Sequence, residues 1–183
     1  MNPRLVAVAT EFGISSDLIA ARGFRLCEEA TYLEVAESGV DGREHLLIPA
    51  ASKAWRMLKS EALADGISLF IVSAFRSIDW QAEIVRRKLS DGLAIEEALR
   101  ICAPPGYSEH HTGRAVDVST PGVPLLEVEL DQTPAFAWLT ANASQFGFHL
   151  SYPVGNAQGY QYEPWHWCFD EAQTLVRVNH RQA

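Results

Sequence analysis

Apolar residues near the middle of the chain recur with the spacing of one helix face. Five of them follow the pattern i, i+3, i+4, i+7 and i+11: Ala51, Ala54, Trp55, Leu58 and Ala62. This spacing is typical of an amphipathic helix that buries one side. Gly66 follows, and glycine often ends a helix. The pattern therefore predicts a helix between Pro49 and Gly66.

The segments that follow predict a strand and two more helices. Residues 67–74, ISLFIVSA, form a short β-branched run that is apolar on both faces, as in a buried strand. A helix is expected from about Ser77, whose hydroxyl can cap it, to Gly92. A third helix is expected over 94–101, because Pro104 and Pro105 prevent it from continuing.

The two ends of the chain add shorter elements. Residues 31–38 and 43–49 read as two strands around a turn, and residues 16–22 as a short helix. In the C-terminal half, 114–119 alternates like a strand, 133–145 is helical, and 146–152 and 160–169 are extended. We therefore expect an α+β fold, with a central, mostly antiparallel sheet and helices packed on one side.

Length and charge narrow the possible functions. The chain has 183 residues, 48% of them hydrophobic, which suits a single domain over 1–183. Its formal charge is −8, from 15 basic and 23 acidic residues. A nucleic-acid partner is not expected, because neutralising phosphates requires a basic surface. An anionic membrane surface is disfavoured for the same reason.

The first residues carry no apolar run long enough for a signal peptide or a membrane span, so we expect a cytoplasmic protein. The cysteines, Cys27, Cys102 and Cys168, are odd in number and lack the pair spacing of a metal site. They are expected to be reduced thiols.

The segment GYSEHHTGRAVD, residues 106–117, contains candidate metal ligands. An open catalytic zinc site needs three protein ligands and a free fourth position. His110 and Asp117 can supply two of them, because Gly113 allows the chain to turn between them. Histidine and aspartate are also common in polar loops. This segment alone therefore favours a polar loop without a metal over a metal site.

A second candidate segment is YEPWHWCF, residues 162–169. His166 lies between tryptophans, which suits either a buried core histidine or a metal ligand in dry surroundings. Glu163 precedes it by three residues. A carboxylate beside a metal can act as the proton carrier of a hydrolase, whereas an isolated one is usually a solvated turn residue.

Together, SAFRS (73–77), SEHHTGRAVD (108–117) and YEPWHW (162–167) resemble the zinc D-alanyl-D-alanine carboxypeptidases and dipeptidases, whose fold is shared with hedgehog. The resemblance covers about residues 50–170; residues 1–45 match none of its motifs, and residues 122–132 have no assigned role. It implies one Zn²⁺ per chain and the following roles: metal ligands His110, Asp117 and His166; catalytic residues Glu163 and Arg76; substrate-binding residues Ser108 and Gln81.

The resemblance also implies the activity. It points to hydrolysis of a C-terminal D-amino acid from a peptidoglycan stem peptide or its precursor. Separately, we expect a monomer without a membrane span. One alternative is a peptidoglycan endopeptidase of the phage-lysin kind, released to the wall. A second is a zinc-bearing binding module without turnover, although such a module would have no need for Glu163.

Other residues near the motifs receive structural interpretations. His111 is expected to line the cleft or support the ligands, because a fourth protein ligand would close the site to water. His149 is expected to be structural, and His45 and His180 to be exposed. Cys168 stands where relatives often carry a basic residue, and we interpret it as a buried thiol.

Overall fold

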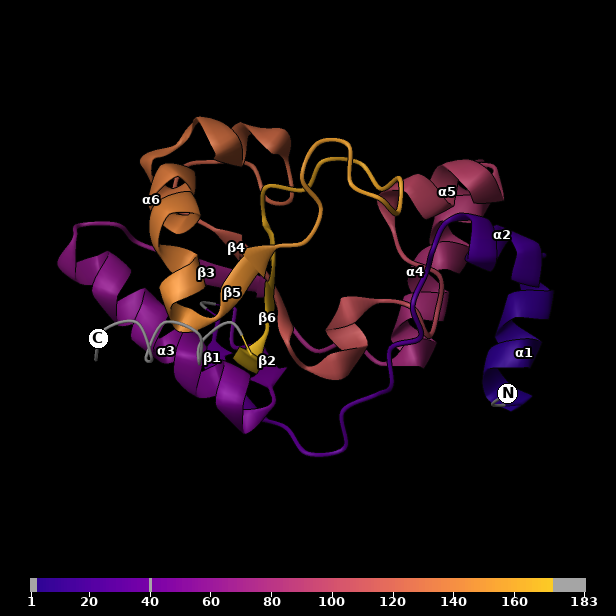
Figure 1. The fold of residues 1–183 in the computed structure, drawn as a ribbon, viewed down its shortest axis with the longest axis horizontal. Helices are drawn as coiled ribbons and strands as arrows, with labels where there is room; N and C mark the ends of the chain where they lie inside the picture. The colour runs from indigo at the N-terminus through magenta and orange to yellow at the C-terminus, as the bar shows by residue number, and fades with distance from the viewer. Residues whose placement is uncertain (1–2, 40, 173–183) are drawn as a thin grey trace.

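The computed structural model describes residues 3–39 and 41–172 (Figure 1). Its α-helices are α1 (Pro3–Glu11), α2 (Ser16–Ala21), α3 (Pro49–Ala64), α4 (Ile78–Ser90), α5 (Ile95–Ile101) and α6 (Pro134–Asn142). Its strands are β1 (Glu34–Ser38), β2 (Glu44–Leu47), β3 (Phe70–Ser73), β4 (Ala115–Ser119), β5 (Phe148–Leu150) and β6 (His166–Phe169). Three 3₁₀ helices complete the set: η1 (Glu109–Thr112), η2 (Val128–Gln132) and η3 (Ala143–Phe146).

The strands form two antiparallel sheets. β1 and β2 make a hairpin, and the other four strands make a sheet of order β3-β4-β6-β5. Every neighbouring pair in the larger sheet is antiparallel. The expectation of an α+β fold built on an antiparallel sheet is therefore confirmed.

The larger sheet has one face for the core and one for polar chemistry. Val116 and Val118 of β4, with Trp167 and Phe169 of β6, belong to the main hydrophobic core. Trp55 of α3 belongs to the same core, which also receives side chains from α6. Because successive side chains of a strand point to opposite faces, the residues between them point away from that core.

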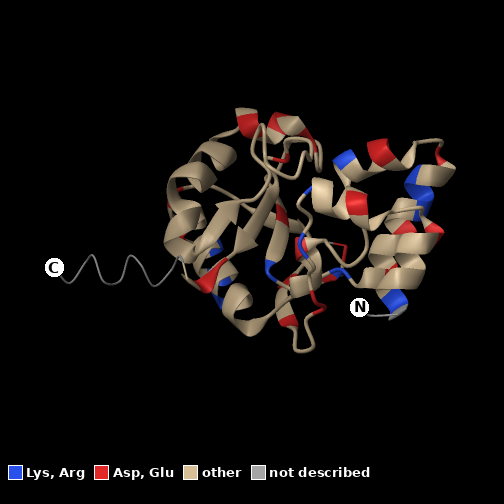
Figure 2. Cartoon of the chain, turned by 45° about the vertical axis from the view of Figure 1, so that its right-hand side comes forward, with Lys and Arg blue, Asp and Glu red and all other residues tan. Residues whose placement is uncertain are grey.

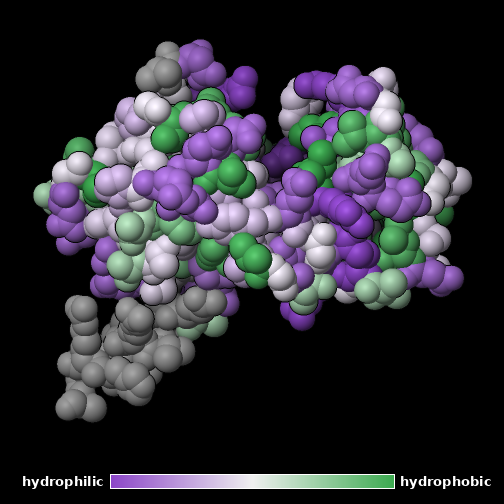
Figure 3. Space-filling view, turned by 90° about the horizontal axis from the view of Figure 1, so that it is seen from above, coloured by the Kyte–Doolittle hydropathy of each residue, from purple (hydrophilic) through white to green (hydrophobic). Residues whose placement is uncertain are grey.

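A second group of helices lies across from the sheet. α1, α2, α4 and α5 gather at the right of Figure 1, around a separate apolar cluster that includes Phe12, Val85 and Leu99. Acidic and basic residues are interspersed along these helices (Figure 2). Seen from above, a deep hollow separates the two halves of the molecule (Figure 3). No helix within residues 3–39 and 41–172 is long and apolar enough to cross a bilayer.

Most expected elements occur where the patterns place them, but the strands are shorter. Pro49–Ala64 is helical and buries Trp55 and Leu58, as its spacing predicts. In contrast, only Phe70–Ser73 of the expected strand 67–74, and only His166–Phe169 of 160–169, pair with a neighbour. The residues before His166 instead form a loop, and residues 160–163 of this loop line the cavity between the two halves of the molecule.

One surface expectation is wrong and another lies outside the described residues. His45 is buried rather than exposed, because β2 turns it inward, with 6% of its surface exposed. His180 falls within 173–183, outside the described residues. The cysteines are free, as expected, and Cys168 is buried.

Gly113 ends η1 and directs the chain into β4. Its φ is +64°, in the left-handed region that favours glycine. A Cβ at this position would lie 2.7 Å from Cδ2 of Leu33 and 3.2 Å from the backbone nitrogen of Ile48. The turn between the two motif segments therefore requires glycine for both its conformation and its close packing.

We expect Gly113→Ala to lower the free energy of unfolding by about 2–3 kcal/mol, since a left-handed alanine costs about 1–2 kcal/mol before any steric contact. Gly66→Ala is the matched control, because Gly66 has a φ of +78° and nothing within 4 Å of its Cβ position. Urea unfolding measures both. Equal losses would show that the contact with Leu33 and Ile48 contributes nothing.

Candidate metal and catalytic site

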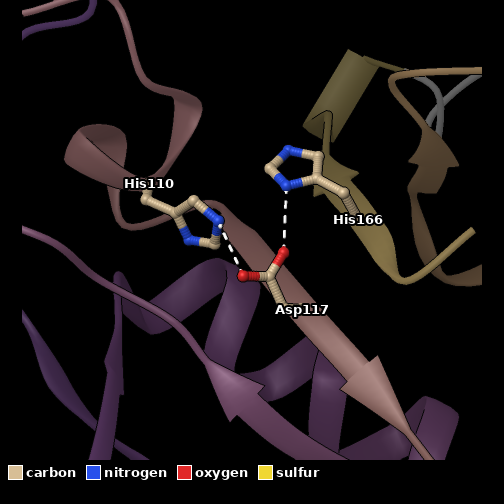
Figure 4. A group of neighbouring side chains, drawn as sticks. All are labelled: His110, Asp117 and His166. Atoms are coloured by element: carbon tan, nitrogen blue, oxygen red, sulfur yellow. Dashed lines mark hydrogen bonds and ion pairs between the residues drawn. The ribbon is translucent and has the colours of Figure 1, made fainter. Parts of the chain in front are cut away.

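Three of the sequence-predicted residues meet on the polar face of the sheet. Ligand atoms of His110, Asp117 and His166 all lie within 4.8 Å of one another, and all three residues are buried. Asp117 lies between the imidazoles, with one carboxylate oxygen toward each (Figure 4). Oδ2 is 3.2 Å from Nε2 of His110, and Oδ1 is 3.1 Å from Nδ1 of His166.

Backbone register brings these groups together. Asp117 and His166 are paired across β4 and β6, although 49 positions separate them in the chain. His110 comes from η1, which leads into β4 through Gly113. Two ligands therefore stand on neighbouring strands, and the third on the short helix before one of them.

Each imidazole uses its remaining nitrogen to hold its orientation. Nδ1 of His110 lies 2.7 Å from the backbone oxygen of Ala74, to which it can donate. Nε2 of His166 lies 2.9 Å from Oε2 of Glu109. These bonds leave Nε2 of His110 and Nδ1 of His166 facing Asp117, and two imidazoles with one carboxylate are a donor set suited to zinc.

The charges in the cluster are strongly coupled. Burial alone would raise the pKa of Asp117, but the two imidazoles outweigh it and lower that pKa. Burial lowers the pKa of His110 to about 4. Burial also opposes a charge on His166, but hydrogen bonds to Asp117 and Glu109 prevail and raise its pKa to about 10. Asp117 and Glu109 thus hold His166 as a cation.

Glu163 stands beside this cluster without joining it. Its Oε2 is 3.9 Å from Nδ1 of His166, and its side chain is 12% exposed. Burial raises its pKa to about 7, and the charge of His166 only partly opposes the shift. A carboxyl group with this pKa can both accept and return a proton near neutral pH.

Arg76 reaches the site from the segment after β3. Its Nη2 lies 3.6 Å from Oδ2 of Asp117, and its Nη1 donates to Oε1 of Gln81 at 3.0 Å. Gln81 is fully buried, and its Nε2 donates to the backbone oxygen of Ala103 at 2.6 Å. In this structure the amide of Gln81 therefore holds the guanidinium of Arg76.

These residues share one cavity of about 650 Å³. The predicted site residues that line it are Arg76, Gln81, Ser108, His110, Asp117, Glu163 and His166. Its outer walls include Lys88 of α4 and Glu127 in the loop before η2. This volume falls within the usual range of about 300–1,000 Å³ for ligand pockets, and Figure 3 shows the hollow from above.

Two residues of the second motif have contacts that the sequence did not reveal. His111 is fully buried and lies outside the metal group; its Nδ1 is 2.5 Å from the backbone oxygen of Arg76, and its Nε2 accepts from the backbone N–H of Gly106 at 3.0 Å. It therefore braces the chain that carries Arg76. Glu109 was not predicted at all, although its place between Ser108 and His110 could have drawn attention to it.

Comparison with known proteins agrees with this arrangement. Residues 44–172 match the profile of the VanY family, described as D-alanyl-D-alanine carboxypeptidase. A D-alanyl-D-alanine carboxypeptidase of Enterococcus faecalis is 30% identical over 130 residues, which cover 66% of this chain and 47% of the relative. The chain thus spans about half the length of that relative.

Two solved structures are similar over most of the chain. The LdcB LD-carboxypeptidase, whose structure addresses peptidoglycan recognition, has 28% identity and a TM-score of 0.71, covering 83% of this chain and 75% of its own. A mutant of the vancomycin-resistance D,D-pentapeptidase VanY, in complex with Zn(II), has 27% identity and a TM-score of 0.64, covering 82% and 85%. With the family profile matched over both motif segments and the strands that carry them, this chain belongs to the VanY family of D-alanyl-D-alanine carboxypeptidases.

Proposed function

We propose that this chain is a zinc-dependent carboxypeptidase that removes the C-terminal D-amino acid, D-alanine above all, from peptidoglycan stem peptides or their precursors. The observation that carries the proposal is the convergence of His110, Asp117 and His166 beside Glu163 in one cavity. The VanY relative with bound Zn(II) and the activity of the E. faecalis relative support the metal and the reaction class.

His110, Asp117 and His166 would hold the metal. When bound, zinc supplies Lewis acidity, which activates water and polarises the scissile carbonyl. Glu163 takes a proton from the attacking water on its carboxylate and delivers it to the nitrogen of the leaving amino acid. Its pKa of about 7 suits both transfers.

Arg76 would stabilise the negative charge that develops on the carbonyl oxygen. A guanidinium keeps its charge at any physiological pH and donates in a fixed geometry. Its hydrogen bond to Gln81 orients it before substrate arrives. Ser108 lines the same cavity, and we assign it to the terminal carboxylate of the peptide. Gln81, the second candidate for that role, also lines the cavity, and its amide already bonds Arg76 and the backbone of Ala103.

Product analysis tests the proposal. Stem peptides that end in D-alanine after a penultimate D- or L-residue, together with intact sacculi, are incubated with the zinc-loaded protein and examined by mass spectrometry. We expect loss of one terminal D-alanine, abolished by a chelator and restored by Zn²⁺. Cleaved cross-links without free alanine would instead establish an endopeptidase, and no product from any substrate would favour a binding module.

Glu163→Ala removes the proton carrier but no metal ligand. We expect kcat to fall by about 10²–10⁴-fold, the usual contribution of a positioned acid–base group, while zinc still binds at one ion per chain. Steady-state kinetics and metal analysis of the same preparation measure the two quantities. Near-wild-type kcat would assign proton transfer to another group.

Zinc affinity should depend on pH through His166. Its raised pKa of about 10 means that the zinc-free protein carries a proton that the metal must displace, whereas His110, with a pKa of about 4, is already neutral. Apparent affinity should therefore rise about tenfold per pH unit between about pH 7.5 and about pH 9. Competition with a chelator measures it, and a flat profile would show that His166 is neutral without zinc.

A further inference from the structure

The imidazole of His166 is held from both sides by carboxylates. Its Nδ1 lies 3.1 Å from Oδ1 of Asp117, and its Nε2 lies 2.9 Å from Oε2 of Glu109. The ring can offer only one nitrogen to a metal. Because Nδ1 faces Asp117 and the ligand cluster, Nε2 is the nitrogen that keeps a proton and donates to Glu109.

We propose that Glu109 is a positioning residue that fixes the tautomer and orientation of His166, and thereby sets the affinity of this site for zinc. The inference rests on the proposed metal site. It assigns Glu109 no contact with substrate or metal, since Glu109 lies behind His166 and is not among the described residues that line the cavity. Glu163, by contrast, does line it.

Glu109 is itself oriented by the protein. The hydroxyl of Ser151 donates to the same Oε2 at 2.6 Å. The thiol of Cys168 also interacts with this carboxylate. Of the described groups that interact with Glu109, which include His149 through its charge, only His166 both hydrogen-bonds to this carboxylate and can carry a positive charge. The charge of Glu109 is therefore directed at His166.

The two histidine ligands are supported in different ways. Nδ1 of His110 lies against the backbone oxygen of Ala74, which no substitution removes. Nε2 of His166 lies against a side chain, which can be replaced. Carboxylate partners of metal-bound imidazoles raise the basicity of the ligand and restrict its rotation. Loss of Glu109 should therefore act on one ligand only.

The experiment compares the zinc dissociation constants of wild type, Glu109→Ala and Glu109→Gln by chelator competition at one pH. We expect Glu109→Ala to weaken zinc binding by about 10–100-fold, the usual effect of removing such a partner. Glu109→Gln should lose less, because its amide oxygen can still accept from Nε2 of His166. Wild-type affinity in Glu109→Ala would overturn the proposal.

Glu37→Gln is the matched control. Glu37 is a largely buried carboxylate that accepts from Nε1 of Trp55 at 2.9 Å and from the backbone N–H of Ile71 at 3.2 Å, and pairs with Lys59 at 2.9 Å, apart from the metal cluster. The substitution Glu37→Gln should lower the stability of the zinc-free protein and leave its zinc affinity unchanged. An equal loss of zinc affinity in Glu37→Gln and Glu109→Gln would show that Glu109 acts only through stability, and would overturn the proposal.

Two further comparisons keep the test decisive. If Glu109→Ala fails to fold, Ser151→Ala takes its place, because it removes a donor that orients Glu109. Ser151→Ala should weaken zinc binding severalfold, and unchanged zinc affinity in this variant would contradict the inference.

A wild-type protein that binds zinc but hydrolyses nothing would refute the proposed function, whereas the ranking of zinc affinities would still decide the role of Glu109.

Discussion

The pairing of β4 with β6 is the constraint on which the site depends. It sets Asp117 opposite His166, and the same register sets Val116 opposite Trp167. A slip of one residue would turn Asp117 into the core and a valine into the cavity, because the side chains of a strand alternate between faces. The apolar face therefore fixes the register, and the register in turn places two metal ligands side by side.

The charges on the polar face explain why such a cluster can be buried. An isolated carboxylate at the position of Asp117 would be expensive to desolvate, since nothing in an apolar interior replaces its hydration. Here two imidazoles and Arg76 surround it, and His166 carries a proton between Asp117 and Glu109. Without metal, the cluster balances its carboxylates with that proton. A bound dication would supply the positive charge that this proton supplies in its absence.

In the second helical group, α4 and α5 contribute to the opposite wall of the cavity, and Gln81 of α4 holds Arg76 in place. The described N-terminal residues, which precede the family match at residue 44, do not line the cavity but contact the loop beside it. The backbone N–H of Cys27 donates to the oxygen of Gly106, and that of Ala30 to the oxygen of His111, both at 2.8 Å. His111 then contacts the backbone of Arg76. The region to which the sequence assigned no role thus supports the loop that carries the motif.

Sequence periodicity by itself determined α3, the existence of β4 and the need for glycine at position 113, because each depends on residues close together in the chain. The motifs named candidate ligands, but choosing His110 over His111 required a resemblance to a family. Only the tertiary structure decided that His111 faces Arg76, that Glu109 holds His166 and that Gln81 is engaged by Arg76. Those contacts join segments that meet only after the sheet has formed, and no local pattern encodes the register and packing that bring them together.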